Sequence, residues 1–255
     1  MGVLGFRRRS TWAVTMAVGV LVSGLAGCGA QEPTTPADHA APADLILDPD
    51  DLPSGFRPTQ FTVSDLVAGN RGPIDAAKSA EVTPPDCRPT ADADLNPQLT
   101  AANSAVLGAR SSSASLVELV TTARRDIEAD IRVTTGRCAT TTTVVGSGNL
   151  RGARIVTRYS EVPTPGIGTD DRRVGQSLAL RSMVSTTLPD GATSTQVGYA
   201  GYALVERPDG SSVTVQLTVS GDASPASRTP TPPVEPMTSA AFADAFGDAV
   251  EAAHN

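Results

Sequence analysis

Hydrophobic and polar residues alternate along much of the second half of the chain, and a period of two is typical of strands with one buried face. The strictest alternation runs over Ser211–Val219, where threonine and glutamine stand between valines and leucine. Similar segments at Arg154–Val162, Ser177–Thr187 and Ser194–Glu206 predict three more strands. The segment Arg207–Gly210 predicts a turn, because its proline presets φ and its glycine accepts the left-handed conformation. These strands indicate an antiparallel sheet with one face in the core and one in water.

The first half of the chain carries weaker signals. Ala114–Thr121 and the threonine-rich run Thr140–Val145 predict strands, because β-branched residues favour them. Phe56–Val67 predicts a further strand, and Asn96–Val106 predicts a short helix. Between these two, Gly69–Pro97 is rich in proline and is expected to form loops.

Two segments show helical spacing. In Arg124–Thr134, Ile127 and Ile131 lie four residues apart on one face, and Gly136 supplies a stop signal. A second helix is expected over residues 239–253, with an apolar stripe that packs on the sheet. The stripe consists of Phe242, Ala245, Phe246, Ala249 and Val250.

Together the elements predict an α+β fold, a mostly antiparallel sheet of five to seven strands with helices packed on one face. We expect a single domain over residues 44–255, with a proline-rich loop at 223–236 before the last helix. The preceding segment, 28–43, is small, polar and interrupted by prolines, which is typical of a flexible tether.

The N-terminus has the three parts of a secretory signal peptide. Three arginines at 7–9 form a basic head, an apolar run follows over Thr11–Leu25, and small residues end it. The last four residues, Leu25-Ala26-Gly27-Cys28, resemble the bacterial lipobox at every position. The resemblance implies that residues 1–27 are cleaved as a lipoprotein signal peptide and that Cys28 is diacylated on its sulfur. Two acyl chains, each worth about 0.8 kcal/mol per buried methylene, would hold the protein on a membrane.

Three alternatives stay open for this segment. A simple cleaved signal peptide would leave Cys28 as a free thiol. An uncleaved anchor over Thr11–Ala30 would just reach the ~20 residues of a membrane span, although glycines crowd its far end. A twin-arginine signal at Arg8–Arg9 would change the export route and not the destination.

The chain contains three cysteines. If Cys28 carries lipid, Cys87 and Cys138 remain, and two cysteines in an exported protein indicate one disulfide. This bond would close a loop of about 50 residues, worth roughly 4 kcal/mol in the chain-entropy model. It would also join the end of the Arg124–Thr134 helix to the segment around Cys87. Two unpaired buried thiols are the alternative.

Charge and composition narrow the classes of function. The chain has a net charge of −7, and removal of residues 1–27, which hold three arginines and no acidic residue, lowers it to −10. Such a surface repels nucleic acid, so no nucleic-acid partner is expected. The same removal takes away Trp12, the only tryptophan, and this shortage of aromatic rings argues against a carbohydrate site.

Residues suited to catalysis or metal binding are scarce. The two histidines, His39 and His254, lie in the tether and beside the C-terminus, which argues against a Ser-His-Asp triad or a zinc site. Asp48, Asp50 and Asp51 lack the other ligands of a calcium loop, so we expect a turn with an aspartate cap. We assign no catalytic residue, no metal ligand and no cofactor. A hydrolase or transferase built on paired carboxylates stays open, because spatial pairing does not show in a sequence.

The pattern as a whole is similar to mycobacterial and related actinobacterial surface lipoproteins. The similarity rests on the lipobox, the tether, Asp48–Phe56, Gly201–Val205 in a run of strands, two further cysteines and an amphipathic C-terminal helix. Some of these proteins resemble the extracellular sensor domain of a mycobacterial Ser/Thr protein kinase. The resemblance implies a sheet flanked by helices, with a cleft for an unidentified ligand. The kinase domain has two disulfides, whereas this chain can form one.

These observations favour a lipid-anchored protein of the cell envelope, outside the cytoplasm, that binds a ligand or a partner protein without catalysis. A lipid carrier is the first alternative, and it would need an apolar cavity of at least several hundred cubic ångströms. A carboxylate-dependent hydrolase or transferase is the second. It would show converging carboxyl groups with raised pKa values in a cleft.

Overall fold

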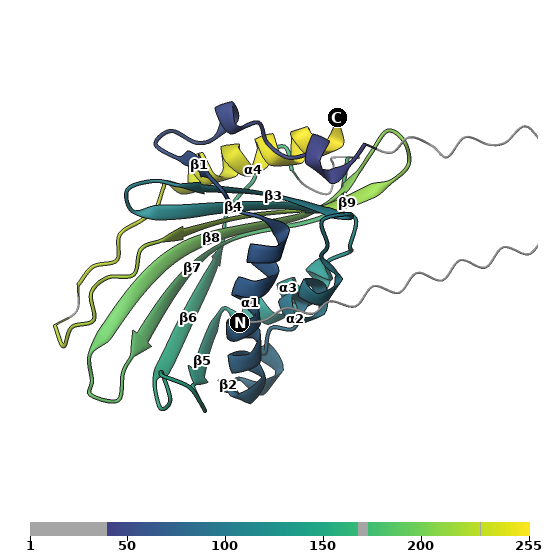
Figure 1. Cartoon of the computed structure of the whole chain (residues 1–255). Coiled ribbons are helices and arrows are strands. Elements are labelled where there is room, and N and C mark those ends of the chain that lie inside the picture. The colour runs from purple at the N-terminus through teal and green to yellow at the C-terminus, as the bar shows by residue number, and fades with distance from the viewer. Residues whose placement is uncertain (1–39, 168–172, 230) are drawn as a thin grey trace, which may run out of the picture. The chain divides into compact units, whose positions relative to one another are not determined.

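The computed structural model describes residues 40–167, 173–229 and 231–255. These residues fold into a nine-stranded antiparallel sheet with four α-helices, which confirms the α+β class (Figure 1). The signal peptide at 1–27, Cys28, His39 and all but the last four residues of the 28–43 tether lie outside the described residues. Those expectations therefore stay predictions.

The strands follow the order β1-β3-β4-β9-β8-β7-β6-β5-β2, and each pairs antiparallel with its neighbours. Their bounds are β1 Arg57–Thr59, β2 Glu81–Thr83, β3 Ser104–Arg110, β4 Ala114–Thr121, β5 Thr140–Val144, β6 Arg154–Glu161, β7 Val174–Thr187, β8 Thr193–Glu206 and β9 Ser212–Gly221. β7 and β8 are the longest, at 14 residues each. The sheet curves strongly along these strands (Figure 1).

The sheet has two strands beyond the seven expected, β2 and β3, whereas β1 lies within the strand predicted over Phe56–Val67. β1 and β2 are edge strands of three residues each, too short to show alternation. β3 lies partly where a helix was predicted over Asn96–Val106, and that prediction is wrong beyond a short 3-10 turn at Asn96–Gln98. The alanines and leucine of Ser104–Arg110 favour a helix locally, but pairing with β4 over seven residues outweighs this preference.

The largest departure from the sequence prediction is helix α1, Val63–Ser79, where a strand and then loops were expected. Thr62 and Asp65 form a capping box, in which the backbone N–H of Asp65 donates to Oγ1 of Thr62 at 3.2 Å. Pro73 lies inside this helix. Proline usually ends a helix, so Pro73 argued against a helix in this segment although the capping box is a good signal for a helix N-terminus.

Helices cover both faces of the sheet, so the prediction of helices on one face is wrong. The other helices are α2 Ala91–Leu95, α3 Ile127–Thr134 and α4 Ser239–His254. Figure 1 shows α4 on one side of the sheet and α1, α2 and α3 on the other. In β9, Val215 and Val219 belong to the core beneath α4, whereas Thr214 and Gln216 hydrogen-bond to Arg125 on the opposite face. The face expected to be in water is thus partly covered by helices.

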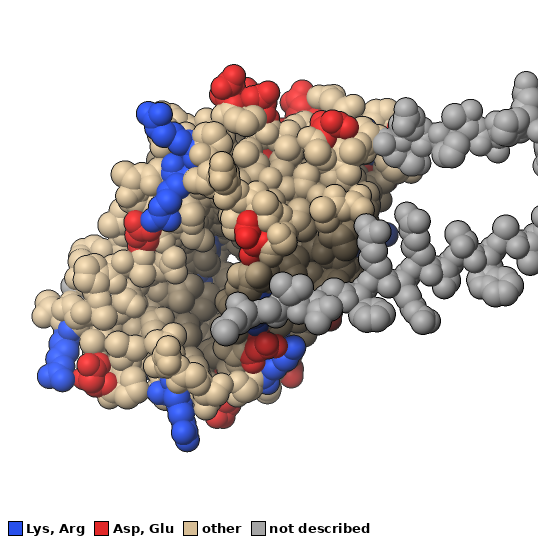
Figure 2. Space-filling view, viewed as in Figure 1, with Lys and Arg blue, Asp and Glu red and all other residues tan. Residues whose placement is uncertain are grey.

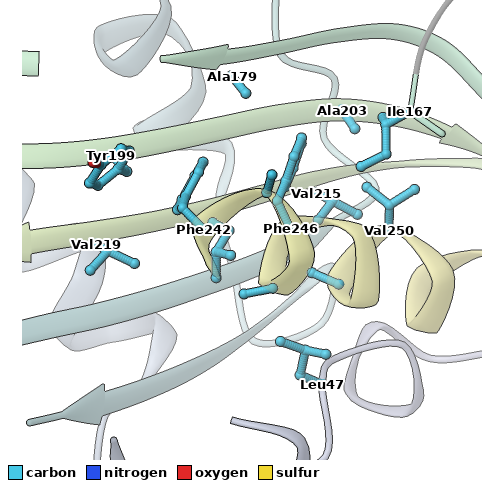
Figure 3. Close-up of a cluster of buried hydrophobic side chains, with 14 of the residues drawn as sticks. Leu47, Ile167, Ala179, Tyr199, Ala203, Val215, Val219, Phe242, Phe246 and Val250 are labelled. Atoms are coloured by element: carbon cyan, nitrogen blue, oxygen red, sulfur yellow. The ribbon is translucent and has the colours of Figure 1, made fainter. Parts of the chain in front are cut away.

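The main core lies between α4 and the centre of the sheet, and the predicted apolar stripe is confirmed there. Figure 3 shows Phe242 and Phe246 pointing from α4 toward the strands, and both are fully buried. A Cβ atom on Gly201 would lie 2.7 Å from the ring of Phe246. The glycine in β8 therefore permits close packing of this ring.

The predicted disulfide is confirmed. Cys87 and Cys138 are bonded, with their Cα atoms 5.4 Å apart, and both are buried. The bond joins the short 3-10 helix Pro85–Cys87 to the 3-10 helix Gly136–Cys138 that follows α3. Gly136 has φ of 55°, consistent with its predicted role as the stop after the helix. A buried disulfide is typical of a protein that folds in an oxidising compartment.

The first part of the proline-rich segment 223–236 runs alongside the start of β8. Ser227 and Thr193 form a β-bridge, and the backbone N–H of Ser224 donates to the carbonyl oxygen of Thr195 at 2.8 Å. Near its end, Glu235 pairs with Arg181 and accepts a hydrogen bond from the hydroxyl of Tyr199 at 3.0 Å. These contacts hold the loop against the sheet before α4 begins.

Candidate ligand-binding cavity

Helix α1 is anchored to the rest of the fold through its N-terminal half. Val63 is buried and packs with Leu95, Leu99 and Leu119, and Leu66 and Val67 join the same cluster. The C-terminal half carries mainly small residues toward the sheet. A helix that packs closely at one end and presents small side chains at the other leaves space beneath it.

That space is an open cavity of about 460 Å³ between the C-terminal half of α1 and the strands β5 and β6. Eight of its eleven wall residues are apolar or glycine. The wall consists of Pro73, Ala76, Ala77, Ala80, Thr143, Val145, Ser147, Gly148, Asn149, Leu150 and Ile155. Small-molecule sites span about 300–1,000 Å³ and are lined mainly by apolar groups, and this cavity meets both criteria.

The floor of the cavity comes from paired residues on the curved sheet. Thr143 in β5 lies opposite Ile155 in β6, and both are half-buried. Figure 2 shows a hollow in the surface between the curved strands and the helices, and none of the residues of the cavity wall is charged. An apolar ligand would therefore lie against side chains that already lack full contact with water.

One end of the cavity is closed by the loop after β5. Ser147 and Ser79 hydrogen-bond through their hydroxyls at 3.2 Å. A Cβ atom on Gly146 would lie 2.8 Å from the carbonyl oxygen of Ser79, so only glycine fits at this approach. Leu150 stands at the rim with 45% of its surface exposed.

The end of α1 is held by Arg88, the residue after Cys87. Its guanidinium donates hydrogen bonds to the carbonyl oxygens of Ala77 and Ala80, the latter at 2.7 Å. A cation at the C-terminus of a helix also interacts favourably with the helix dipole. Because Cys87 is bonded to Cys138, the disulfide fixes the chain position from which Arg88 reaches α1.

A buried charged cluster centred on Arg125 lies on the same face of the sheet. Its Nε donates to Asp130 at 2.6 Å, and its Nη1 donates to Asp92 at 2.7 Å and to Gln216 at 3.1 Å. The guanidinium lies 4.0 Å from the ring centre of Tyr202. These contacts join α2 and α3 to β8 and β9.

The electrostatics of this cluster favour a structural role. Burial alone would lower the pKa of Arg125, but Tyr202, Asp130 and Asp92 outweigh burial and hold it above its ordinary value. Burial raises the pKa of Asp130, and its hydrogen bonds with Arg125 oppose that shift. Burial also raises the pKa of Tyr202. Asp92 and Asp130 thus converge on a cation, and their oxygens are engaged in ion pairs.

Glu118 is a further buried carboxyl group, on the face that α4 covers. It is fully buried and accepts a hydrogen bond from the backbone N–H of Leu47 at 3.1 Å. Burial raises the pKa of Glu118 to about 8, and the bond from Leu47 opposes this shift. The group lies beneath the chain segment around Leu47 and outside the cavity walls.

The remaining residues weighed for chemistry have ordinary structural roles. Asp48 caps the short 3-10 helix Pro49–Asp51 by accepting from the N–H of Asp50 at 2.9 Å, which confirms the predicted turn. Nδ1 of His254 lies 2.7 Å from the carbonyl oxygen of Glu206. In the part of the chain that the structure describes, no three His, Cys, Asp or Glu side chains are placed to hold a metal ion.

The resemblance implied a cleft, but none of the cavity's wall residues was predicted from the sequence, because the walls come from two segments about 70 residues apart in an arrangement set by the fold. Comparison with protein-family models, curated proteins and solved structures finds no match to this chain. Within residues 40–167, 173–229 and 231–255, no helix has the length and apolar character needed to cross a membrane.

Proposed function

We propose that this protein is a non-catalytic binding module of the cell envelope that takes a small apolar ligand into the cavity beneath α1. The observation that carries the proposal is the cavity itself, about 460 Å³ with mainly apolar walls. Burial of apolar surface yields about 25 cal/mol per Å², so an apolar molecule that fills such a space gains affinity without any charged contact.

The proposed location rests on two features. The lipobox-like segment ending at Cys28 would tether the protein to the outer side of a membrane through acyl chains. The Cys87–Cys138 disulfide supports folding in an oxidising compartment. A binding module held there would meet apolar molecules that leave the neighbouring lipid.

The proposed absence of catalysis is supported by the placement of the carboxyl groups. Those with raised pKa values are Asp130, which is paired with Arg125, Glu118, which is covered by the Leu47 segment, and the exposed Asp248 on α4. None of them lines the cavity. Asp248 lines a separate, open pocket with Asp51 and Glu251, and burial followed by the neighbouring carboxylates raises its pKa. These carboxyls lie outside the apolar cavity, so they do not converge on a ligand held there.

A fluorescence titration tests the proposal. The chain from residue 28 onward with Cys28→Ser, which needs no detergent, is titrated with N-phenyl-1-naphthylamine, a neutral apolar probe. Ala77→Phe places a ring in the cavity, and we expect it to weaken binding about tenfold, equivalent to about 1.4 kcal/mol. Ala68→Phe is the matched control, since Ala68 is exposed on the same helix and lies outside the cavity. Equal binding by both variants would reject the cavity as the site.

A lipid carrier remains the second candidate, because the same cavity meets the size that a carrier needs. A carrier must release its ligand to a second membrane, whereas a binding module need not. Transfer of a fluorescent lipid between two populations of vesicles, with and without the protein, separates these functions. Acceleration that Ala77→Phe abolishes would favour the carrier.

A further inference from the structure

A second open cavity, of about 280 Å³, lies along the same half of α1. Its walls include Pro73 and Ala77, which also bound the first cavity. In a helix, residues four apart lie on one face, so these two form a stripe. Ala76 and Ala80 flank the stripe toward the first cavity, and Ile74 and Lys78 flank it toward the second. The two cavities therefore adjoin one another, with the Pro73–Ala77 stripe as their shared wall.

The two cavities differ in chemistry. The first has no charged residue in its wall, whereas the second is bounded by Lys78, Arg88 and Asp92. Asp92 already binds Arg125, a cation outside the cavity, at 2.7 Å. The second cavity therefore presents two cations against one carboxylate that is partly neutralised, and it favours a negative group.

The two cations are held differently. Lys78 pairs with Asp75 at 2.9 Å, but both side chains are about two-thirds exposed, at 66% and 71%. Such an exposed pair contributes little and exchanges readily. Arg88 is half-buried, with its guanidinium fixed by two carbonyl oxygens of α1. A fixed guanidinium beside an exposed ammonium suits an anionic group that enters from solvent.

From this arrangement we infer that the ligand is a single-chain amphiphile with an anionic head. Its hydrocarbon chain lies in the first cavity, and its head lies in the second, beside Lys78 and Arg88. The inference rests on the proposed binding function and adds the class of ligand to it. Carboxylate and phosphate heads share the required chemistry, and the test includes both.

The test measures displacement of N-phenyl-1-naphthylamine from the Cys28→Ser protein by dodecanoate, dodecyl phosphate and dodecanol. All three have hydrocarbon chains of the same length and differ in the head group. Anionic heads are expected to bind about tenfold more tightly than the alcohol at low salt, and the difference should shrink as salt is added. If dodecyl phosphate displaces the probe and dodecanoate does not, the head is a phosphate, and the reverse result assigns a carboxylate.

Variants distinguish the contribution of the anionic head group to affinity from that of the hydrocarbon chain. Lys78→Gln is expected to weaken dodecanoate about threefold and to leave dodecanol unchanged. Arg71→Gln removes a charge from an exposed position of the same helix outside both cavities, and it serves as the control. Equal affinities for dodecanoate and dodecanol, or equal effects of the two variants, would overturn the anionic head while the apolar site stands. If the Cys28→Ser chain without further substitutions binds neither the amphiphiles nor the neutral probe, the proposed function is overturned as well.

Discussion

At the scale of single residues, Arg125 is the centre of the buried charged cluster on the face of the sheet that α2 and α3 cover. It is 3% exposed and contacts residues from α2, α3, β8 and β9. Removing one member of a buried ion pair leaves the other charge without compensation, at a cost of about 3–5 kcal/mol. The geometry requires the forked guanidinium, so lysine is a poor replacement.

We predict that Arg125→Met lowers the free energy of unfolding by about 3–5 kcal/mol because Asp130 stays buried without its partner. Urea unfolding followed by circular dichroism measures this change. The double variant Arg125→Met with Asp130→Leu is expected to recover part of the loss. Arg132→Met, at an arginine 63% exposed on α3, is the control and should change stability by less than about 0.5 kcal/mol. A loss no larger than that of the control would contradict the structural role.

A second prediction concerns the pH dependence of stability. Burial raises the pKa of Glu118 to about 8 from its ordinary value of 4.5. The folded state therefore keeps this proton over a range in which the unfolded state has released it, and stability falls as pH rises between these two values. Titration of Glu118 should lower the free energy of unfolding by roughly 2–4 kcal/mol as the pH rises across this range.

Glu118→Gln should remove this dependence, because the amide stays neutral and its oxygen still accepts from the N–H of Leu47. Unfolding free energies of wild type and variant are compared at pH 5 and pH 8, with the exposed Glu81→Gln as the control for loss of a carboxyl elsewhere. A wild-type curve parallel to that of Glu118→Gln would show that Glu118 does not titrate in this range.

At the scale of elements, the central strands were predictable and α1 was not. β9 could be assigned because its apolar residues face one core, so local pattern and tertiary environment agree. α1 could not, since only Val63 of its 17 residues is buried and its glycines and Pro73 weaken a helical pattern. The usable signal was the cap, Thr62 followed by Asp65 three residues later.

The disulfide acts on α1 as well as on global stability. Replacing Cys87 and Cys138 by serine should lower the unfolding free energy by about 4 kcal/mol, because the closed loop is long. It should also increase hydrogen exchange at residues 76–80, because Arg88 loses its fixed position next to the helix end. Exchange measured by mass spectrometry tests this effect.

Arg88→Gln provides the matched comparison for that experiment. It keeps the disulfide and removes the hydrogen bonds to Ala77 and Ala80, so local exchange should rise with a smaller global loss. If neither variant changes exchange in this segment, the link between the disulfide and the cavity wall does not exist.

At the scale of the whole molecule, the two faces of the sheet have different packing. The face beneath α4 is filled by a continuous core that includes Phe242 and Phe246. The opposite face is covered by shorter helices and by α1, which leaves two cavities open. The well-packed face supplies stability, so the other can hold space for a ligand without loss of the fold.

Placement of this domain at a membrane depends on Cys28, and intact mass of the native protein extracted from membranes tests it. We predict loss of residues 1–27, a gain of diacylglyceryl mass on Cys28, and a mass lower by the two hydrogens of the Cys87–Cys138 bond. Cys28→Ala should leave the protein unmodified and release it from the membrane fraction, because the acyl chains on Cys28 are what is proposed to hold it there. A full-length chain in membranes, or a Cys28→Ala variant that stays there, would assign the attachment to the segment before Cys28. The ligand would then have to be sought with that segment in place.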